Sequence, residues 1–265
     1  MIKAGMRLAA IATALGGWGL STALSSATAA PVVAHHPRIA ASHGQGGSGG
    51  GAAGWASSNW SGYAVTGANG TYTSVTGQWT VPSVSSTRSA TYSSNWIGID
   101  GFNDSNLIQT GTESDYYSGS AHYYAWWEIL PAAETRISSI SVQPGDVMTA
   151  AINQVSAGVF TIVITDTRGS QTFTTQQSYK GQLSSAEWIE EAPSLGGRIA
   201  TLAHYKSPTP FDPGTANGAS PHLVASEGGV MIQGRSQVST PSAPDGDADG
   251  FNMAYGSSAP SPPSS

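Results

Sequence analysis

Three carboxylates lie close together in the stretch AEWIEEAP, residues 186–193, which contains Glu187, Glu190 and Glu191. Only 10% of the chain is charged, so a cluster of this kind stands out. An ionised glutamate can take a proton from water and later return it as an acid, which is the chemistry of general acid–base hydrolysis. A carboxylate with this task needs a partner that binds the substrate or the water, and other parts of the sequence have to contain it.

The side chains of a β-strand alternate between two faces, and this alternation sorts the cluster. If residues 187–191 form a strand, Glu187, Ile189 and Glu191 point one way, and Trp188 and Glu190 point the other way. A polar side chain on a face that should be apolar is either paired within the fold or exposed in a lined cleft.

Two other stretches show the same arrangement of polar and apolar residues. In HYYAWWEIL, Tyr124, Trp126 and Glu128 share a face, and in NLIQTG, Leu107 shares a face with Gln109. Taken singly, each of these polar residues is more often structural than catalytic.

Other chemistries leave weaker signals. The chain has no Cys, and its histidines are scattered without the spacing of a zinc site, so we expect no metal and no cofactor. A serine triad stays open, because its members need not be adjacent in sequence. The stretch DGDADG, Asp245 to Gly250, matches the opening of a calcium loop, yet position twelve is Gly256 instead of a bidentate Glu. We interpret this stretch as an acidic turn.

The elements that would position these residues are short strands rich in β-branched and aromatic residues and bounded by Gly, Pro, Asn or Asp. The clearest are TYTSVTGQWTVP, SNWIGIDG, NLIQTG, HYYAWWEILP, VMTAAINQV, VFTIVITD, AEWIEEA and GGVMIQG. No stretch has the periodicity of an amphipathic helix. The pattern favours an all-β fold, an antiparallel sandwich or barrel, in one domain.

The ends of the chain differ in composition from this region. Lys3 and Arg7 precede an apolar run, and Ala27-Thr28-Ala29 offers a cleavage site, so residues 1–29 are predicted to be a signal peptide of a secreted protein with no later membrane contact. Residues 30–54, rich in Gly, Ser and Ala, are predicted to be a flexible linker or a short pro-segment with little to bury. The predicted domain covers residues 55–256, and residues 257–265 are predicted to be a disordered Ser/Pro tail.

The charge of the chain excludes one class of partner. Of 10 basic residues, Lys3 and Arg7 would leave with the signal peptide, so 10 − 2 = 8 remain against 16 acidic residues, a net charge of −8. This balance argues against nucleic acid binding. Few positive charges remain to repel one another when carboxylates are protonated, which suits an acid environment. We expect a monomer.

Six blocks in order resemble the eqolisin family of glutamic peptidases. They read SSNWSGY (57–63), VTGQWTVPSV (75–84), NWIGIDG (95–101), LIQTG (107–111), YYAWWEILP (123–131) and AEWIEEA (186–192), and the resemblance extends from Ser57 to about Tyr255. It implies a β-sandwich of two long, bent antiparallel sheets with the active site on a concave face. The absence of Cys and the predicted signal peptide suggest a bacterial member.

The resemblance also implies a catalytic dyad and a substrate class. Gln109 and Glu191 match the catalytic Gln and Glu of the family, which hydrolyses peptide bonds in proteins and peptides in acid. Trp96, Asp100 and Glu128 match residues that line or support the site. Glu191 would act first as a base and then as an acid, and Gln109 would orient water and stabilise the oxyanion.

Two alternatives from other classes stay open. A jelly-roll glycoside hydrolase could pair Glu128 with Glu191 and stack sugars on the 8 Trp and 10 Tyr residues. A non-catalytic carbohydrate-binding sandwich is the third interpretation, and it would tolerate the loss of Glu191.

Overall fold

The structure is a computed structural model that describes residues 30–41 and 54–265. The chain divides into two compact units, Met1–Pro31 and Val32–Ser265, and the description below concerns the second. The predicted signal peptide, residues 1–29, and residues 42–53 of the predicted linker lie outside the described residues. Within the described ranges, no helix has the length and apolar character that crossing a membrane would require.

The described residues are almost entirely β-structure, as the sequence predicts. The strands are β1 (Trp55–Ser57), β2 (Trp60–Thr66), β3 (Ser74–Thr80), β4 (Ser94–Ile99), β5 (Ile108–Tyr117), β6 (Ser120–Ile129), β7 (Thr135–Ile137), β8 (Val147–Ser156), β9 (Val159–Asp166), β10 (Gln171–Ser178), β11 (Ser185–Glu191), β12 (Ser194–Leu195), β13 (Arg198–Ile199), β14 (Thr209–Ala216), β15 (Gly228–Gln233), β16 (Ser236–Pro241) and β17 (Phe251–Tyr255). One 3-10 turn, η1 (Ala225–Glu227), precedes β15.

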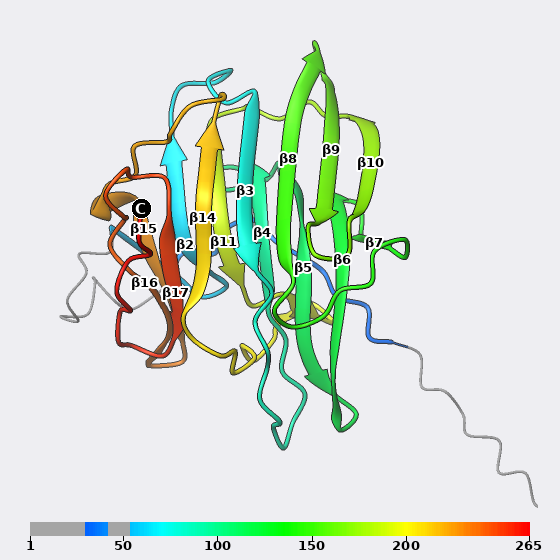
Figure 1. The fold of residues 1–265 in the computed structure, drawn as a ribbon, viewed down its shortest axis with the longest axis vertical. Helices are drawn as coiled ribbons and strands as arrows, with labels where there is room; N and C mark the ends of the chain where they lie inside the picture. The colour runs from blue at the N-terminus through cyan, green and yellow to red at the C-terminus, as the bar shows by residue number, and fades with distance from the viewer. Residues whose placement is uncertain (1–29, 42–53) are drawn as a thin grey trace, which may run out of the picture. The chain divides into compact units, whose positions relative to one another are not determined.

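Most of these strands belong to one large sheet that folds over on itself. Its order is β10-β9-β8-β3-β14-β17-β16-β15-β2-β11-β4-β5-β6-β7, with β1 added beside β15. Neighbours along this path pair antiparallel, whereas β1 pairs with β15 in parallel. In Figure 1, β14, β3, β8, β9 and β10 form a front layer, and β2, β11, β4, β5 and β6 lie behind it. The confirmed fold class is therefore an antiparallel β-sandwich.

The main core fills the space between the two layers. Trp79 and Ile162 of the front layer belong to the same apolar cluster as Ile97 and Trp188 of the rear layer. The indole nitrogen of Trp79 also donates a hydrogen bond to Thr112 Oγ1 across the layers, at 2.9 Å. Burial of this apolar surface is what holds a fold without disulfide bonds together.

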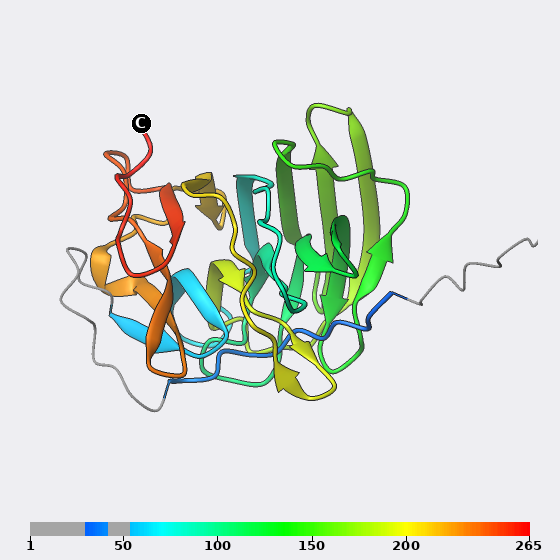
Figure 2. The same cartoon turned by 90° about the horizontal axis from the view of Figure 1, so that it is seen from below.

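The rear layer has a second apolar cluster on its other face. Trp60, Trp96, Leu107, Trp126 and Ile189 are all fully buried there. What covers them is the N-terminal segment, residues 32–41, which we call the covering segment. Figure 2 shows this segment (blue) running across the rear layer on the side that faces away from the front layer.

The prediction that residues 30–54 have little to bury is wrong for the covering segment. Val33 and His35 are 0% and 1% exposed. Ala34 pairs with Ser194 through two backbone hydrogen bonds of 3.0 and 2.8 Å. The segment is attached mainly by polar contacts, which a count of apolar residues does not detect.

The C-terminal tail also differs from the prediction of disorder. Residues 257–265 form no regular element, but Asn252 Nδ2 donates to the Ser261 carbonyl and Gly246 N–H to Ser265 Oγ, both at 2.9 Å. Local hydrogen bonds thus fix a stretch that is too polar to bury apolar surface.

Candidate active site

The register of four adjacent strands brings the predicted site residues onto one face of the rear layer. On β4, Gly98 pairs with Glu187 of β11 on one side and with Gln109 of β5 on the other, and Gln109 pairs with Glu128 of β6. Side chains at paired positions lie on the same face of a sheet. Because the side chains of β11 alternate, Glu191 lies on this face together with Glu187.

Gln109 is fixed by a carboxyl group. Its Nε2 donates a hydrogen bond of 2.7 Å to Glu128 Oε2, and its Oε1 is buried without a hydrogen-bond partner. Burial and the charge of Glu191 raise the pKa of Glu128 to about 7, although His35 and the bond from Gln109 act in the opposite direction. Glu128 is therefore neutral in acid, and a neutral carboxyl group holds the amide.

Glu191 is fully buried and accepts hydrogen bonds from two elements. Trp96 Nε1 of β4 donates to its Oε2 at 2.9 Å, and His35 Nδ1 of the covering segment lies 3.0 Å from the same oxygen. The backbone N–H of His36 donates to Oε1 at 3.2 Å. The covering segment thus occupies the surroundings of the predicted base.

Trp96 lies between the two members of the predicted dyad. Gln109 is level with Gly98, whereas Glu191 is level with Ser94, four residues earlier at the start of β4. Four residues of a strand span roughly 13 Å, so the two side chains reach the site from opposite ends. The Trp96 ring covers Gly98, where a Cβ atom would lie 2.9 Å from Cζ3, and its nitrogen reaches Glu191.

Asp100, which follows β4, has a different environment. Its carboxylate accepts hydrogen bonds from the Tyr179 hydroxyl at 2.7 Å, the Leu183 N–H at 2.9 Å and the Ser184 N–H at 2.7 Å. These donors belong to the loop that leads into β11. Asp100 therefore anchors the strand that carries Glu191.

The two other carboxylates of the AEWIEEAP stretch are fully buried on opposite faces. Glu190 accepts a bond from Asn95 Nδ2 at 2.5 Å, and both Glu187 oxygens lack a hydrogen-bond partner. Burial raises the pKa of both carboxyl groups well above the ordinary value. Each is therefore neutral in acid, and a neutral carboxyl group cannot take a proton from water as a general base does.

Sequence reasoning missed His35, which contacts Glu191, and two carboxyl groups that contact His35, those of Glu113 and Glu134. His35 Nε2 lies 3.4 Å from both Glu113 Oε1 and Glu134 Oε2, and its ring stacks on Trp126 with centroids 3.9 Å apart. Glu113 follows Gln109 by four positions, so strand alternation could have placed it on the site face. His35 and Glu134 lie outside regular strands, where alternation gives no signal.

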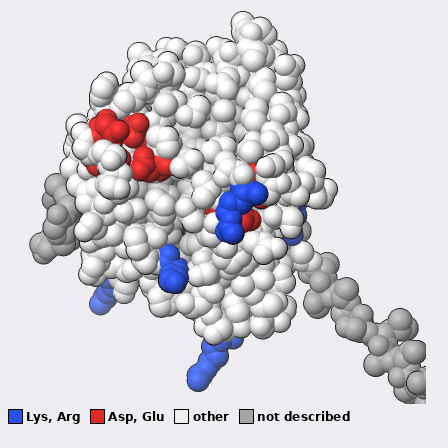
Figure 3. Space-filling view, viewed as in Figure 1, with Lys and Arg blue, Asp and Glu red and all other residues white. Residues whose placement is uncertain are grey.

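Two groups of side chains in the described residues have ligand atoms close enough together for a cation. One consists of His35, Glu113 and Glu134, and the other of Asp212, Asp245 and Asp249. The second includes part of the DGDADG stretch, and acidic side chains gather on the face seen in Figure 3. Asp245 Oδ1 accepts the N–H groups of Asp249 and Gly250 at 3.2 Å, which is the geometry of an acidic turn.

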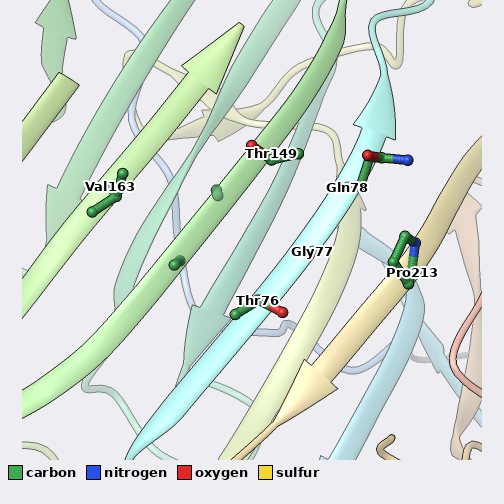
Figure 4. Close-up of a pocket in the computed structure, with 8 residues that line it drawn as sticks. Thr76, Gly77, Gln78, Thr149, Val163 and Pro213 are labelled. Atoms are coloured by element: carbon green, nitrogen blue, oxygen red, sulfur yellow. The ribbon is translucent and has the colours of Figure 1, made fainter. Parts of the chain in front are cut away.

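A hollow on the front layer offers no acid–base chemistry. It has a volume of about 290 Å³, and neutral residues line it, including Thr76, Gln78, Thr149, Val163 and Pro213 (Figure 4). Proton transfer needs a titratable group within hydrogen-bonding reach. The titratable cluster on the rear layer is therefore the better candidate for catalysis.

Comparisons with known proteins show the family of the chain. Residues 58–254 match the Peptidase A4 family. Aspergillopepsin-2 of Aspergillus niger is 31% identical over 217 residues, which cover 72% of this chain and 76% of the relative.

Two solved structures have a similar fold. Scytalido-glutamic peptidase with a transition state analog inhibitor superposes with a TM-score of 0.62 at 23% identity, over 75% of this chain and 98% of that one. Aspergilloglutamic peptidase from Aspergillus niger gives a TM-score of 0.54 at 24% identity, over 62% and 99%. The family match favours peptide hydrolysis over both carbohydrate interpretations. The chain belongs to the Peptidase A4 family, the eqolisins, and is a peptidase.

Proposed function

We propose that this peptidase is a secreted acid endopeptidase in which Glu191 and Gln109 form the catalytic pair. The observation that carries the proposal is the shared face. A carboxylate bonded by Trp96 and an amide bonded by Glu128 lie on one side of the rear layer, with no sulfur or serine nucleophile needed. Protein and peptide chains are the substrates, the enzyme acts as a monomer, and nucleic acid and membranes are not partners.

The reaction needs one water molecule and one proton shuttle. Ionised Glu191 takes a proton from water while the water oxygen bonds to the scissile carbonyl carbon. The oxyanion that forms accepts a hydrogen bond from the amide of Gln109, and a side-chain donor of this kind contributes roughly 3 kcal/mol. Protonated Glu191 then gives its proton to the amine nitrogen as the C–N bond breaks, which restores the carboxylate.

The N-terminal region acts in this proposal as a pro-segment. His35 and the backbone of His36 bond the carboxylate of Glu191, and Glu191, Gln109 and Trp96 are all 0% exposed. A substrate can reach the pair only after the covering segment has left. The full chain is therefore latent, and cleavage in or near residues 42–54 completes maturation after export.

Two substitutions test the catalytic pair. Glu191→Gln keeps the shape but removes the base, so kcat for a denatured protein at about pH 4 should fall at least ~1000-fold. Gln109→Glu replaces the donor with an acceptor when it is ionised and adds a charge to the cleft, so it should also lose kcat heavily while the chain stays folded.

Controls separate this pair from other protease mechanisms. Glu190→Gln alters a neighbouring buried carboxyl group on the opposite face and should keep activity. Pepstatin and EDTA should not inhibit. A Glu191→Gln chain that is free of host protease and still cleaves at the wild-type rate would refute the assignment.

A further inference from the structure

The pocket that holds His35 is bounded by acidic groups and one aromatic ring. Its walls are Glu113 of β5, Trp126 of β6, Glu134 in the loop before β7, and Glu191 of β11. The imidazole lies nearly parallel to Trp126, at an interplanar angle of 16°. Carboxylates thus face both ring nitrogens while the indole covers the flat face, an arrangement that suits a planar cation.

Further acidic groups lie around the pocket. Burial raises the pKa of Asp115, beside Glu113, and that of Glu128 to about 7, so both are neutral in acid and become negative near neutral pH. The cation opposite them is Arg136, whose Nε lies 3.4 Å from Glu134 Oε1 and whose side chain covers the Tyr124 ring. The other oxygen of Glu134 and both oxygens of Glu113 have no hydrogen-bond partner. Of these atoms, Glu113 Oε1 and Glu134 Oε2 each lie 3.4 Å from His35 Nε2, and a positive charge on the imidazole would balance them.

His35 supplies that charge. Burial alone lowers the pKa of His35, but the charge of Glu191 and the contacts with Glu134 and Glu113 raise it well above 6.5. Nearby carboxylates favour the charged form of a buried imidazole and offset the cost of its desolvation. The pocket therefore favours the imidazolium form of its occupant.

The covering segment enters the pocket as an extended peptide does. Ala34 and Ser194 exchange antiparallel backbone hydrogen bonds immediately before His35. Adding a strand to a sheet edge in this manner is a common mode of peptide binding, in which pockets for side chains give specificity. One wall of the pocket is Glu191 itself, so a substrate held for attack by Glu191 would place a nearby side chain in the same pocket.

We infer that the pocket of Glu113, Trp126 and Glu134 is a substrate subsite for a protonated histidine side chain, which His35 fills until the covering segment leaves. This inference rests on the proposed function, because it requires Glu191 to mark the point of cleavage. It assigns a substrate class to the peptidase, namely peptides with a histidine close to the scissile bond.

The first test measures binding without catalysis. In the full chain, His35→Ala empties the pocket, and imidazole at about pH 6 should then raise the melting temperature by several degrees. Pyrazole has the same shape but is uncharged at this pH, and it should have little effect. The gain in melting temperature should be absent in wild type and in the His35→Ala/Glu134→Gln double variant. Equal responses to imidazole and pyrazole would overturn the inference.

The second test measures specificity. Two peptides that differ only in His or Gln beside the cleaved bond are compared on the His35→Ala chain, and the His peptide should have a kcat/KM roughly tenfold higher. Glu134→Gln, which changes the other carboxyl group beside the imidazole, should bring this ratio near one, whereas Glu190→Gln, on the opposite face, should leave the ratio unchanged.

The outcomes distinguish the inference from the proposed function. A ratio of one with cleavage that still depends on Glu191 would reject the subsite alone. Cleavage that survives Glu191→Gln would reject the proposed function. Stabilisation of the wild-type chain by Zn²⁺, reversed by EDTA, with no response of the His35→Ala chain to imidazole, would overturn the inference in favour of a metal site.

Discussion

The bond between Gln109 and Glu128 ties the proposed oxyanion donor to a carboxyl group whose charge depends on pH. With a pKa raised to about 7, mainly by burial, Glu128 is neutral in acid and ionised in alkali. A neutral carboxyl group orients the amide without adding negative charge beside the developing oxyanion. Raising the pH through 7 would place a charge there and oppose the reaction.

This pairing leads to a prediction for Glu128. Because the group is neutral in acid, Glu128→Gln should keep kcat at about pH 4 within ~3-fold, whereas Glu128→Ala leaves Gln109 without its partner and should lose at least ~10-fold. The measurement is kcat against pH from about 3 to 8, with the melting temperature as a fold control. If Glu128→Gln loses as much as Glu128→Ala in acid, the carboxyl group acts through its charge.

At the scale of elements, strands with clear alternation could be predicted and others could not. VFTIVITD coincides with β9 (Val159–Asp166), and NWIGI with most of β4. The sequence does not predict β14, because Pro210 and Pro213 are unfavourable within a strand. In the structure, Pro213 lies where the pairing of β14 with β3 shifts register. Proline is tolerated at such irregularities. β10 was missed because its outer side chains are polar at an edge of the sheet.

The residues of the site likewise divide into those that the sequence could predict and those that it could not. The resemblance of six ordered blocks to the eqolisins predicted Gln109, Glu128, Trp96 and Glu191, and the register of the strands places these residues on one face. His35 could not be predicted, because its burial depends on carboxylates that are distant in sequence and that only the fold brings together.

The covering segment gives a prediction of its own. His35→Ala removes the side chain that contacts Glu191, Glu113 and Glu134, so the segment should dissociate more readily. The full chain with this substitution should hydrolyse a small peptide at least ~10-fold faster at first than wild type, because less of the site is covered. His222→Ala, which changes a histidine far along the chain, is the matched control.

Initial rates before any cleavage of the chain are the relevant measurement, with intact mass as a check on processing. Equal initial rates for wild type and His35→Ala, with the mass unchanged, would mean that His35 does not keep the enzyme latent.

For the whole molecule, buried neutral carboxyl groups set how stability depends on pH. Burial raises the pKa of Glu113, Glu187 and Glu190 well above the ordinary value, and that of Asp115 to about 7. In the unfolded chain such groups titrate near pH 4. The stabilisation that these groups contribute is complete below about pH 4. It is lost as the pH rises through their pKa values in the folded chain, because unfolding then releases protons.

We therefore expect a higher melting temperature at about pH 4 than at about pH 7.5. Each such group can lower the free energy of unfolding by up to ~1.4 kcal/mol for each pH unit between the two pKa values. Glu190→Gln should weaken the dependence of the melting temperature on pH. The variant should melt at nearly the wild-type temperature in acid and at a higher temperature than wild type near neutral pH. Thermal unfolding across this pH range measures it, and a melting temperature that rises steadily towards pH 7.5 would contradict the expectation.

The covering segment is joined to the peptidase domain by its own chain, and this attachment fixes how strongly it must bind. A tethered ligand acts at an effective concentration in the millimolar range, so modest affinity suffices to keep it in place. Cutting the Gly/Ser-rich stretch between residues 41 and 54 changes this intramolecular equilibrium into a bimolecular one. In dilute solution the concentration of the freed peptide falls far below any modest dissociation constant, so a single cleavage would make activation irreversible without altering one contact in the pocket.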